Sequence, residues 1–254
     1  MARAWDAATY DRVANPQARW GRAVLDRLPL VGDERVLDAG CGTGRVTELL
    51  AARLPRGRVV ALDASASMID AARQRLAPFG DRIEYVVADL GNPLPLAQPV
   101  DAILSTATFH WVPDHDALLA NLAAVLRHGG LLVAQCGGVG NIASVRRVLA
   151  ETGDGWLGLT YYASPLDTVR RLDAAGFVDI ECWLTDEPTR FEPGEPFETF
   201  LRTVILGAHL ERLPPEARDG FVRAVADRLP EPLLDYVRLN IVARRSSRSE
   251  VGGD

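Results

Sequence analysis

Short apolar runs alternate with longer amphipathic segments along the first half of the chain. The short runs are rich in Val, Leu and Ile, which is typical of strands buried on both faces of a parallel sheet. They predict five strands, at residues 35–38, 59–62, 83–87, 100–104 and 131–136. The amphipathic segments predict helices at residues 17–28, 44–53, 65–76 and 116–127, the last one ended by His128-Gly129-Gly130. This alternation predicts βαβ units, and therefore a doubly wound α/β fold with a mostly parallel sheet.

The pattern changes in the second half of the chain. Helical spacing recurs at residues 141–151 and 165–175, and two further strands are expected at residues 177–184 and 236–243. The segment between these two strands holds two amphipathic helices. Their apolar positions are Phe197, Phe200, Leu201, Val204, Ile205 and Ala208 in the first, and Phe221, Val222, Val225 and Leu229 in the second. We interpret this insertion, mainly residues 187–232, as a helical cap over the carboxyl ends of the strands, where open α/β sheets bind ligands. Helices that only thicken the fold are the alternative.

The most specific motif is a glycine-rich turn after the first predicted strand, Asp38-Ala39-Gly40-Cys41-Gly42-Thr43-Gly44. Glycines there allow a tight turn and a close approach of the backbone to a ligand. The dinucleotide pattern G-x-G-x-x-G needs a glycine where Arg45 stands, and no Gly-Lys-Ser/Thr follows as in a phosphate-binding loop. The carboxylate of Asp38 would repel a pyrophosphate but suits an ammonium or a sulfonium group. S-adenosylmethionine (SAM) carries both groups, so the turn favours SAM over NAD, and an NAD-dependent oxidoreductase stays the alternative class.

Two more aspartates stand at strand ends. Asp63 ends the second predicted strand, where an acidic residue accepts hydrogen bonds from the ribose hydroxyls of a nucleoside. Asp89 follows the third strand, where its carboxylate suits the adenine amino group and the N–H of Leu90 suits the adenine ring. The alternative role of each aspartate is a helix cap or a turn residue, and Asp89 taken alone is better explained in that way. Together with Asp38, they lie at three successive strand ends of one sheet edge and predict a nucleoside-binding site.

These residues resemble the pattern of class I SAM-dependent methyltransferases. Further stretches are similar to the trans-aconitate 2-methyltransferase family, namely Trp5 with Tyr10, residues 62–69, residues 109–115 and residues 240–245. The resemblance covers about residues 5–243. It implies a seven-stranded sheet with an antiparallel last strand, SAM as cofactor and a small-molecule methyl acceptor. One departure weakens the case for a tricarboxylate acceptor, because Val204-Ile205-Leu206-Gly207 replaces the family's Thr-Gly-x-Arg in the cap.

The resemblance also implies roles for single residues. Gly40, Gly42 and Gly44 line the methionine moiety, Asp38 faces its ammonium group and Asp63 holds the ribose. The remaining expected cofactor contacts are Asp89 and Leu90 at the adenine edge, Met68 on the adenine face, Tyr10 and Arg19 over the cofactor carboxylate, and Ala64 and Ser105 beside the second and fourth strands.

These roles divide the chain into four parts. Residues 1–30 form an N-terminal helical segment that closes over the cofactor, and residues 31–137 form the SAM-binding core. Residues 138–245 supply the remaining strands and the cap, and residues 246–254 predict a disordered tail.

The acceptor side is less legible. Methyl transfer from a sulfonium is an in-line displacement, so the protein mainly aligns the reacting groups and excludes water. His110, just after the fourth strand, is the candidate catalytic residue, as a base or as an orienting group, with a packing role as the alternative. Candidate acceptor-binding residues are Trp111, Tyr161, Tyr162, Arg202 and His209. The leading hypothesis is O-methylation, for example of a carboxylate such as that of trans-aconitate. C- or N-methylation of a secondary metabolite, and a SAM-binding module without activity, are the alternatives.

Composition narrows the partners. The 28 basic and 34 acidic residues give a net charge of −6, which argues against a nucleic acid. The three cysteines show no C-x-x-C spacing, which argues against a disulfide framework or a zinc site and favours a reducing compartment. The N-terminus has no apolar run of the kind in signal peptides, and no stretch reaches the ~18 apolar residues of a membrane span. We therefore expect a cytoplasmic protein without a metal, and the sequence indicates no oligomeric state.

Overall fold

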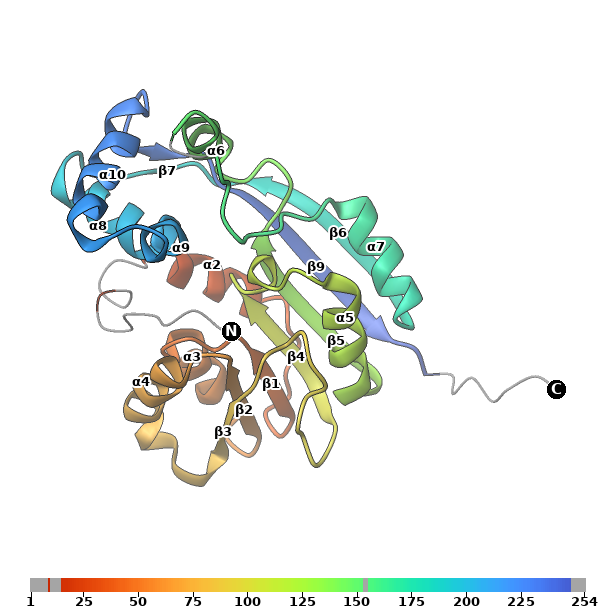
Figure 1. Cartoon of the computed structure of the whole chain (residues 1–254). Coiled ribbons are helices and arrows are strands. Elements are labelled where there is room, and N and C mark those ends of the chain that lie inside the picture. Colours follow the sequence, from red (N-terminus) through yellow and green to blue (C-terminus); the bar gives the residue numbers. More distant parts are fainter. Residues whose placement is uncertain (1–8, 10–14, 153–154, 248–254) are drawn as a thin grey trace.

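A seven-stranded sheet forms the centre of this computed structural model, which describes Thr9, residues 15–152 and residues 155–247 (Figure 1). Its strands are β1 (Arg35–Ala39), β2 (Arg58–Asp63), β3 (Ile83–Val87), β4 (Val100–Thr106), β5 (Leu126–Gly137), β6 (Phe177–Asp186) and β9 (Val237–Arg245). They are ordered β3-β2-β1-β4-β5-β9-β6. All neighbours pair in parallel except β9, which is antiparallel to both β5 and β6. The predicted doubly wound sheet with an antiparallel last strand is confirmed.

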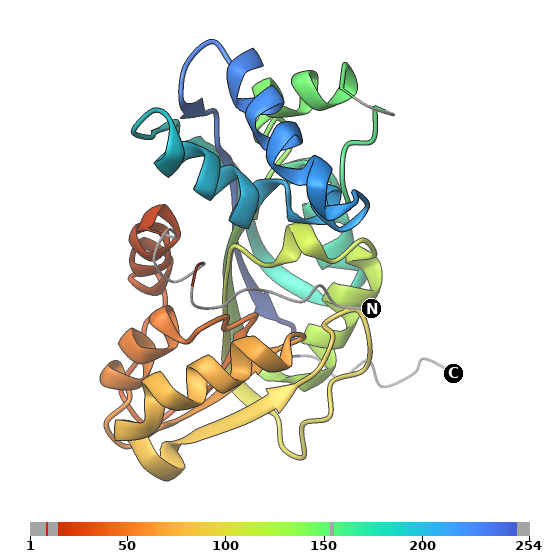
Figure 2. The same cartoon turned by 60° about the vertical axis from the view of Figure 1, so that its left-hand side comes forward.

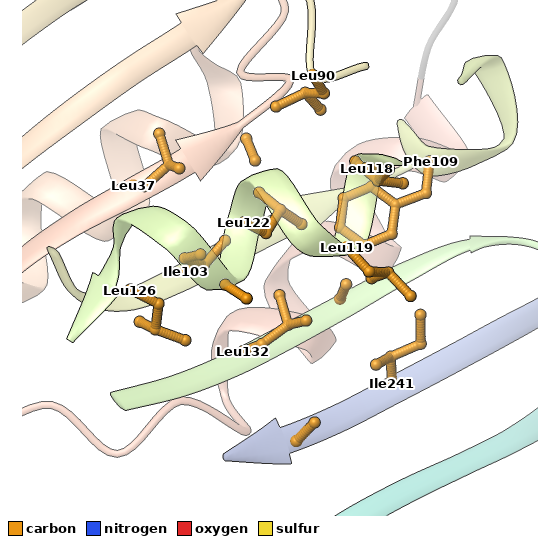
Figure 3. Packing of buried hydrophobic residues seen from close by; sticks show 14 of the residues in the cluster. Leu37, Leu90, Ile103, Phe109, Leu118, Leu119, Leu122, Leu126, Leu132 and Ile241 are labelled. Carbon is orange, nitrogen blue, oxygen red and sulfur yellow. The ribbon is translucent and has the colours of Figure 1, made fainter. Parts of the chain in front are cut away.

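Helices cover both faces of this sheet (Figures 1 and 2). They are α2 (Asn15–Leu25), α3 (Arg45–Arg53) and α4 (Ala66–Leu76) on one face, and α5 (His115–Val125) and α7 (Pro165–Ala174) on the other. Figure 3 shows Leu118, Leu119 and Leu122 of α5 packed on the sheet. Val36 and Leu37 are neighbours in β1, yet each is fully buried in a different one of the two cores. This two-sided burial explains why the strands read as continuous apolar runs.

The insertion between β6 and β9 forms a helical cap. It contains α8 (Glu195–Phe200), a π-helical turn (Leu201–Ile205), α9 (Gly207–Glu211) and α10 (Pro215–Arg228). A two-stranded hairpin of β7 (Thr189–Arg190) and β8 (Leu233–Leu234) joins its two ends. β6 ends, and the antiparallel β9 begins, at the edge where the parallel strands end, so the cap is attached at that edge. It shares a third apolar core with α6 (Ala143–Ala150) and with Trp20 of α2.

Four local features differ from the expectation. Helix α5 ends at Val125 and β5 begins at once, so His128-Gly129-Gly130 lies in the strand; its register against β4 shifts between Val100 and Ala102. The first cap helix is broken, because the N–H of Leu206 donates to the carbonyl of Leu201, five residues back, at 2.7 Å. The hairpin of β7 and β8 was not predicted, since two-residue strands show no periodicity. Short 3₁₀ segments, Ala77–Arg82 and Phe109–Trp111, also went unpredicted.

In the part of the chain that the structure describes, no helix combines the length and the apolar character that crossing a membrane requires. Tyr10 and residues 248–254 of the predicted tail lie outside the described residues.

Candidate functional site

The glycine-rich loop lies where the strand order reverses, between β1 and β4. Such switch points are where open α/β sheets bind ligands. The N–H groups of Gly40 and Cys41 both donate to the carbonyl of Leu62 in β2, at 2.8 and 2.9 Å, which fixes the loop over the ends of two strands. Gly40, Gly42 and Gly44 have φ angles of 86°, 54° and 84°. This left-handed conformation favours glycine, so all three glycines are required by the backbone.

Gly40 and Gly42 differ in what surrounds them. A Cβ on Gly40 would lie 2.2 Å from Oγ1 of Thr108, so this glycine lets the segment after β4 pack against the loop. Thr108 also donates its hydroxyl to the carbonyl of Gly40 at 3.2 Å. A Cβ on Gly42 would meet no protein atom within 4 Å. Gly42 therefore borders open space beside the backbone, which fits the predicted approach of a cofactor to the loop.

Asp38 carries a buried carboxylate at the end of β1. Its Oδ2 accepts a hydrogen bond from the hydroxyl of Thr47 in α3, at 2.7 Å. Its Oδ1 is buried and has no hydrogen-bond partner among the described residues. The pKa of Asp38 is raised to about 7, mainly by burial; the bond from Thr47 opposes the rise, and the charge of Asp63 adds to it. A buried acceptor that lacks a donor is what an ammonium group would complete, so the residue fits the amino group of SAM.

Asp63, at the end of β2, holds the loop from the other side. Its Oδ2 accepts from the N–H of Gly42 at 3.0 Å, and its Oδ1 accepts from the N–H of Ser65 at 2.9 Å. Burial raises the pKa of Asp63, and these backbone bonds oppose the rise. Each carboxylate oxygen has a second lone pair. Ribose binding by Asp63 therefore stays a prediction that its hydrogen bonds allow.

The expected adenine contacts lie around the ends of β2 and β3. Asp89 is exposed, and its Oδ1 accepts from the N–H of Gly91 at 2.9 Å, which is the turn role considered as its alternative. Leu90 is buried on the α5 face of the sheet. Met68 is buried in the first turn of α4, where its N–H meets the Ser65 hydroxyl, whereas Ala64 is exposed.

Two other expected cofactor contacts have protein partners. Ser105 donates its hydroxyl to the carbonyl of Ala39 at 2.6 Å, and so ties the end of β4 to the end of β1. Arg19 extends from α2 to Glu187, with 2.7 Å between Nη2 and Oε2, and its side chain is 66% exposed. Neither contact tests the predicted roles.

His110 is buried at the end of β4. The N–H of Gly137 donates to its Nδ1 at 3.3 Å. Burial lowers the pKa of His110 well below its usual value, and the positive charge of Arg238 and then His115 lower it further. The ring is therefore neutral, and because Nδ1 accepts, its proton is on Nε2. In this state Nε2 of His110 can donate a hydrogen bond, while Nδ1 already accepts one from Gly137.

Two of the predicted acceptor residues gather beside His110 in a pocket of about 530 Å³. Tyr161 and Tyr162 line it, together with Val139, Gly140, Asn141, Ala143, Arg146, Arg147 and Thr160. The ring of Tyr162 lies 5.9 Å from that of His110, and the N–H of Tyr161 donates to the His110 carbonyl at 2.9 Å. The ring of Trp111 also contacts His110, with 5.2 Å between the ring centroids.

The other two predicted acceptor residues have partners inside the cap. Arg202 forms an ion pair with Asp219, with 2.6 Å between Nη2 and Oδ1. The Nε2 of His209 lies 3.0 Å from the carbonyl of Trp156, and the two rings are 4.7 Å apart. Neither Arg202 nor His209 lines the pocket. No group of residues suited to a metal ion occurs in the described ranges.

The sequence analysis missed four residues at this site. Thr47 and Thr108 hold Asp38 and Gly40, and no local pattern marks them. Arg146 lines the pocket, and it was hidden in an ordinary amphipathic helix. Arg238 is 2% exposed in β9, with its guanidinium 4.5 Å from the centroid of the Trp20 ring. A charged residue inside a buried strand was the one available signal.

Comparisons with known proteins point in one direction. A family model described as a methyltransferase domain matches residues 36–130. Trans-aconitate 2-methyltransferase of Methylobacterium radiotolerans is 31% identical over 264 residues, which cover 96% of this chain and 99% of the relative. The enzyme of that name from Azoarcus sp. is 43% identical over 131 residues, 52% of this chain and 50% of the relative.

A solved structure shares the fold. It is phosphoethanolamine N-methyltransferase 2 of Haemonchus contortus, bound to phosphomonomethylethanolamine and S-adenosylhomocysteine. It matches with a TM-score of 0.63 at 20% identity, over 95% of this chain and 57% of that one.

Proposed function

Because the chain belongs to the trans-aconitate 2-methyltransferase family of SAM-dependent methyltransferases, we propose that it methylates a carboxylate oxygen of a small polycarboxylic acid. Its class and its cofactor, SAM, follow from the family, and the comparisons do not favour an NAD-dependent oxidoreductase. C- or N-methylation is the competing possibility for the acceptor. The acceptor is therefore the part of the function that the site has to decide.

The chain's own residues have defined tasks in this scheme. Asp38 binds the ammonium group, Asp63 binds the ribose, and the open side of Gly42 admits the cofactor to the loop. SAM, when bound, supplies an electrophilic methyl group on a sulfonium. The acceptor oxygen forms the new C–O bond while the electrons of the C–S bond leave on sulfur, so an ester and a neutral thioether form and no proton moves.

The observation that carries the proposal is the hydrogen bond that Nδ1 of His110 accepts from the N–H of Gly137. The pKa of His110 also lies well below the usual value, so the ring donates through Nε2 and does not act as a base. The pocket beside it is lined by no carboxylate and no other imidazole among the described residues. A phenol or an ammonium group needs a proton acceptor before methylation. A carboxylate is already ionised at neutral pH and needs none.

The proposal is tested by the chemistry of the product. The purified chain is incubated with SAM labelled in the methyl group and with trans-aconitate, a phenol or a primary amine, each in a separate reaction. We expect label in the trans-aconitate product and its release as methanol by mild alkali, because esters are hydrolysed under conditions that spare ethers and amines. Label in an alkali-stable product of the phenol or amine, with none from trans-aconitate, would refute carboxylate methylation. Binding of S-adenosylhomocysteine, measured by calorimetry, checks separately that the protein is active in cofactor binding.

A further inference from the structure

The pocket beside His110 is strongly cationic in a protein of net charge −6. Among the described residues that line it, two are arginines, Arg146 and Arg147 of α6, and none is acidic. Its volume of about 530 Å³ is in the range of small-molecule sites. Figure 1 shows α6 beyond the end of β5, at the edge of the sheet where the cap is attached. The charge is therefore concentrated where an acceptor would enter.

These two arginines differ from most others in the chain. Neither Arg146 nor Arg147 forms an ion pair or a hydrogen bond through its guanidinium with the described residues, whereas Arg202 of the cap is paired with Asp219. The guanidinium of Arg146 is half-buried and lies 5.4 Å from the centroid of the Tyr162 ring. Contact with an aromatic face orients the planar group and leaves its N–H donors available. A carboxylate or a phosphate matches that fork with two parallel hydrogen bonds.

A buried amide adds a fixed donor to the same pocket. Asn141 is 3% exposed, and its Oδ1 accepts from the N–H of Val237 at 3.0 Å. This bond sets the orientation of the amide, so Nδ2 is the atom available to a ligand. Its neighbour Ile142 has a φ of 48°, a conformation that β-branched residues rarely adopt and that is typical of functional loops.

The pocket is connected to the cofactor loop through a short chain of contacts. Tyr162 lines the pocket and packs 5.9 Å from the ring of His110. His110 is two residues beyond Thr108, so their Cα atoms are at most ~7.6 Å apart. Thr108 is bonded directly to Gly40 of the loop. A ligand anchored at Arg146 would thus extend past Tyr162 toward the point where the acceptor meets the methyl group.

We propose that this pocket binds an anionic group of the acceptor other than the one that is methylated, with Arg146 as the principal contact and Arg147 at the mouth. This inference rests on the proposed function, because the second anion of a polycarboxylate is the natural occupant. Carboxylate and phosphate share the chemistry that Arg146 recognises. The site thereby selects acceptors that carry two negative groups.

The test compares Arg146→Gln with wild type in binding and in turnover. Trans-aconitate and phenyl phosphate are titrated into the protein saturated with S-adenosylhomocysteine. We expect Arg146→Gln to weaken binding about 10- to 100-fold, the usual effect of losing a charged hydrogen-bonding pair. In turnover the same factor should appear in KM for trans-aconitate, with kcat little changed, and Arg146→Lys should recover only part of it. Arg170→Gln, at an exposed residue paired with Asp167 on α7, is the matched control and should leave every value unchanged.

A modified acceptor checks that Arg146 acts on the second anion. In an analogue of trans-aconitate that keeps only the carboxylate to be methylated, with the other two converted to carboxamides, the Arg146→Gln penalty should largely disappear. The melting temperature and S-adenosylhomocysteine affinity of each variant show that the fold and the cofactor site are intact. Equal binding by wild type and Arg146→Gln, or no binding of either probe to wild type, would overturn the inference. Arg146-dependent binding of phenyl phosphate without methylation of trans-aconitate would support the pocket while the proposed function fails.

Discussion

The buried carboxylate of Asp38 makes cofactor binding depend on pH in a predictable way. Burial raises its pKa from 3.8 to about 7, so near neutral pH a large fraction of the cofactor-free protein carries a proton on this group. An ammonium group binds the ionised form, so binding has to release that proton. With a pKa of about 7, affinity for S-adenosylhomocysteine should rise about eightfold between about pH 6 and about pH 7.5. At about pH 6, close to 0.9 proton should be released for each molecule bound.

Stability should move in the opposite direction. The pKa of Asp38 is raised in the folded state, so its contribution to stability is complete below the unfolded value of 3.8 and is lost as the pH rises toward about 7. A shift of about three units corresponds to a loss on the order of 4 kcal/mol in the cofactor-free protein. Asp38→Asn removes the charge, so at about pH 8 it should be more stable than wild type by up to that amount, yet bind S-adenosylhomocysteine more weakly.

Calorimetry in buffers of different ionisation enthalpy measures affinity and proton release together, and thermal unfolding measures stability. Asp70→Asn, at an exposed position in α4, is the control and should behave like wild type. An Asp38→Asn variant that keeps the eightfold pH dependence would show that another group titrates. Wild-type binding that is independent of pH and releases no proton would refute the account of Asp38 altogether.

Three further predictions concern residues at the carboxyl ends of the parallel strands and distinguish effects on stability from effects on binding or catalysis. Thr47→Val removes the hydrogen bond that opposes the rise in the Asp38 pKa, so the midpoint of the affinity–pH curve should move to higher pH in the same calorimetric series. Gly40→Ala should destabilise the fold by about 2–4 kcal/mol in urea unfolding, through overlap with Thr108 and left-handed strain, whereas Gly42→Ala should cost only about 1–2 kcal/mol but weaken S-adenosylhomocysteine binding at least tenfold. The pH profile of kcat for a carboxylate acceptor should show no ionisation of His110 between about pH 5.5 and about pH 8. His110→Gln preserves a donor near Nε2 and should retain more activity than His110→Ala. A rise of kcat with pH that is lost in both variants would instead identify His110 as a base.

The sheet could be predicted from the sequence because each strand is constrained on both faces. Every residue from Val36 to Ala39 is buried, so the strand reads as an apolar run, and the one aspartate near its end, Asp38, stands out against it. The glycine loop was legible for a similar reason, since three left-handed φ angles within five residues leave glycine as the favoured choice. Backbone conformation can be predicted from sequence wherever it strongly favours one residue type.

The acceptor pocket has no such constraint. Its walls come from the loop after β5, from α6 and from residues 160–162, segments that the sequence pattern leaves unrelated. Arg202 is predicted to bind the acceptor, but in the folded chain its Nη2 lies 2.6 Å from Oδ1 of Asp219 and pairs with it. Arg146 lies in an amphipathic helix, where an arginine is usually solvated, so the sequence does not mark it as a binding residue. Only the fold shows that one cation has a partner and the other faces a pocket.

The N-terminal helix α2 contributes side chains both to the core beneath the glycine loop and to the core of the cap. Val24 and Leu25 of α2 are buried in the core beneath the cofactor loop, while Trp20, about one turn earlier, is buried in the core of the cap. The Trp20 ring meets Tyr236 edge-on at 5.0 Å, and Arg238 lies over its face. The charge of Arg238 in turn lowers the pKa of His110, so one helix links cap packing, the buried cation and the protonation state of the group beside the acceptor. Packing of the cap on Trp20 is therefore connected, through Arg238, to the electrostatics at His110.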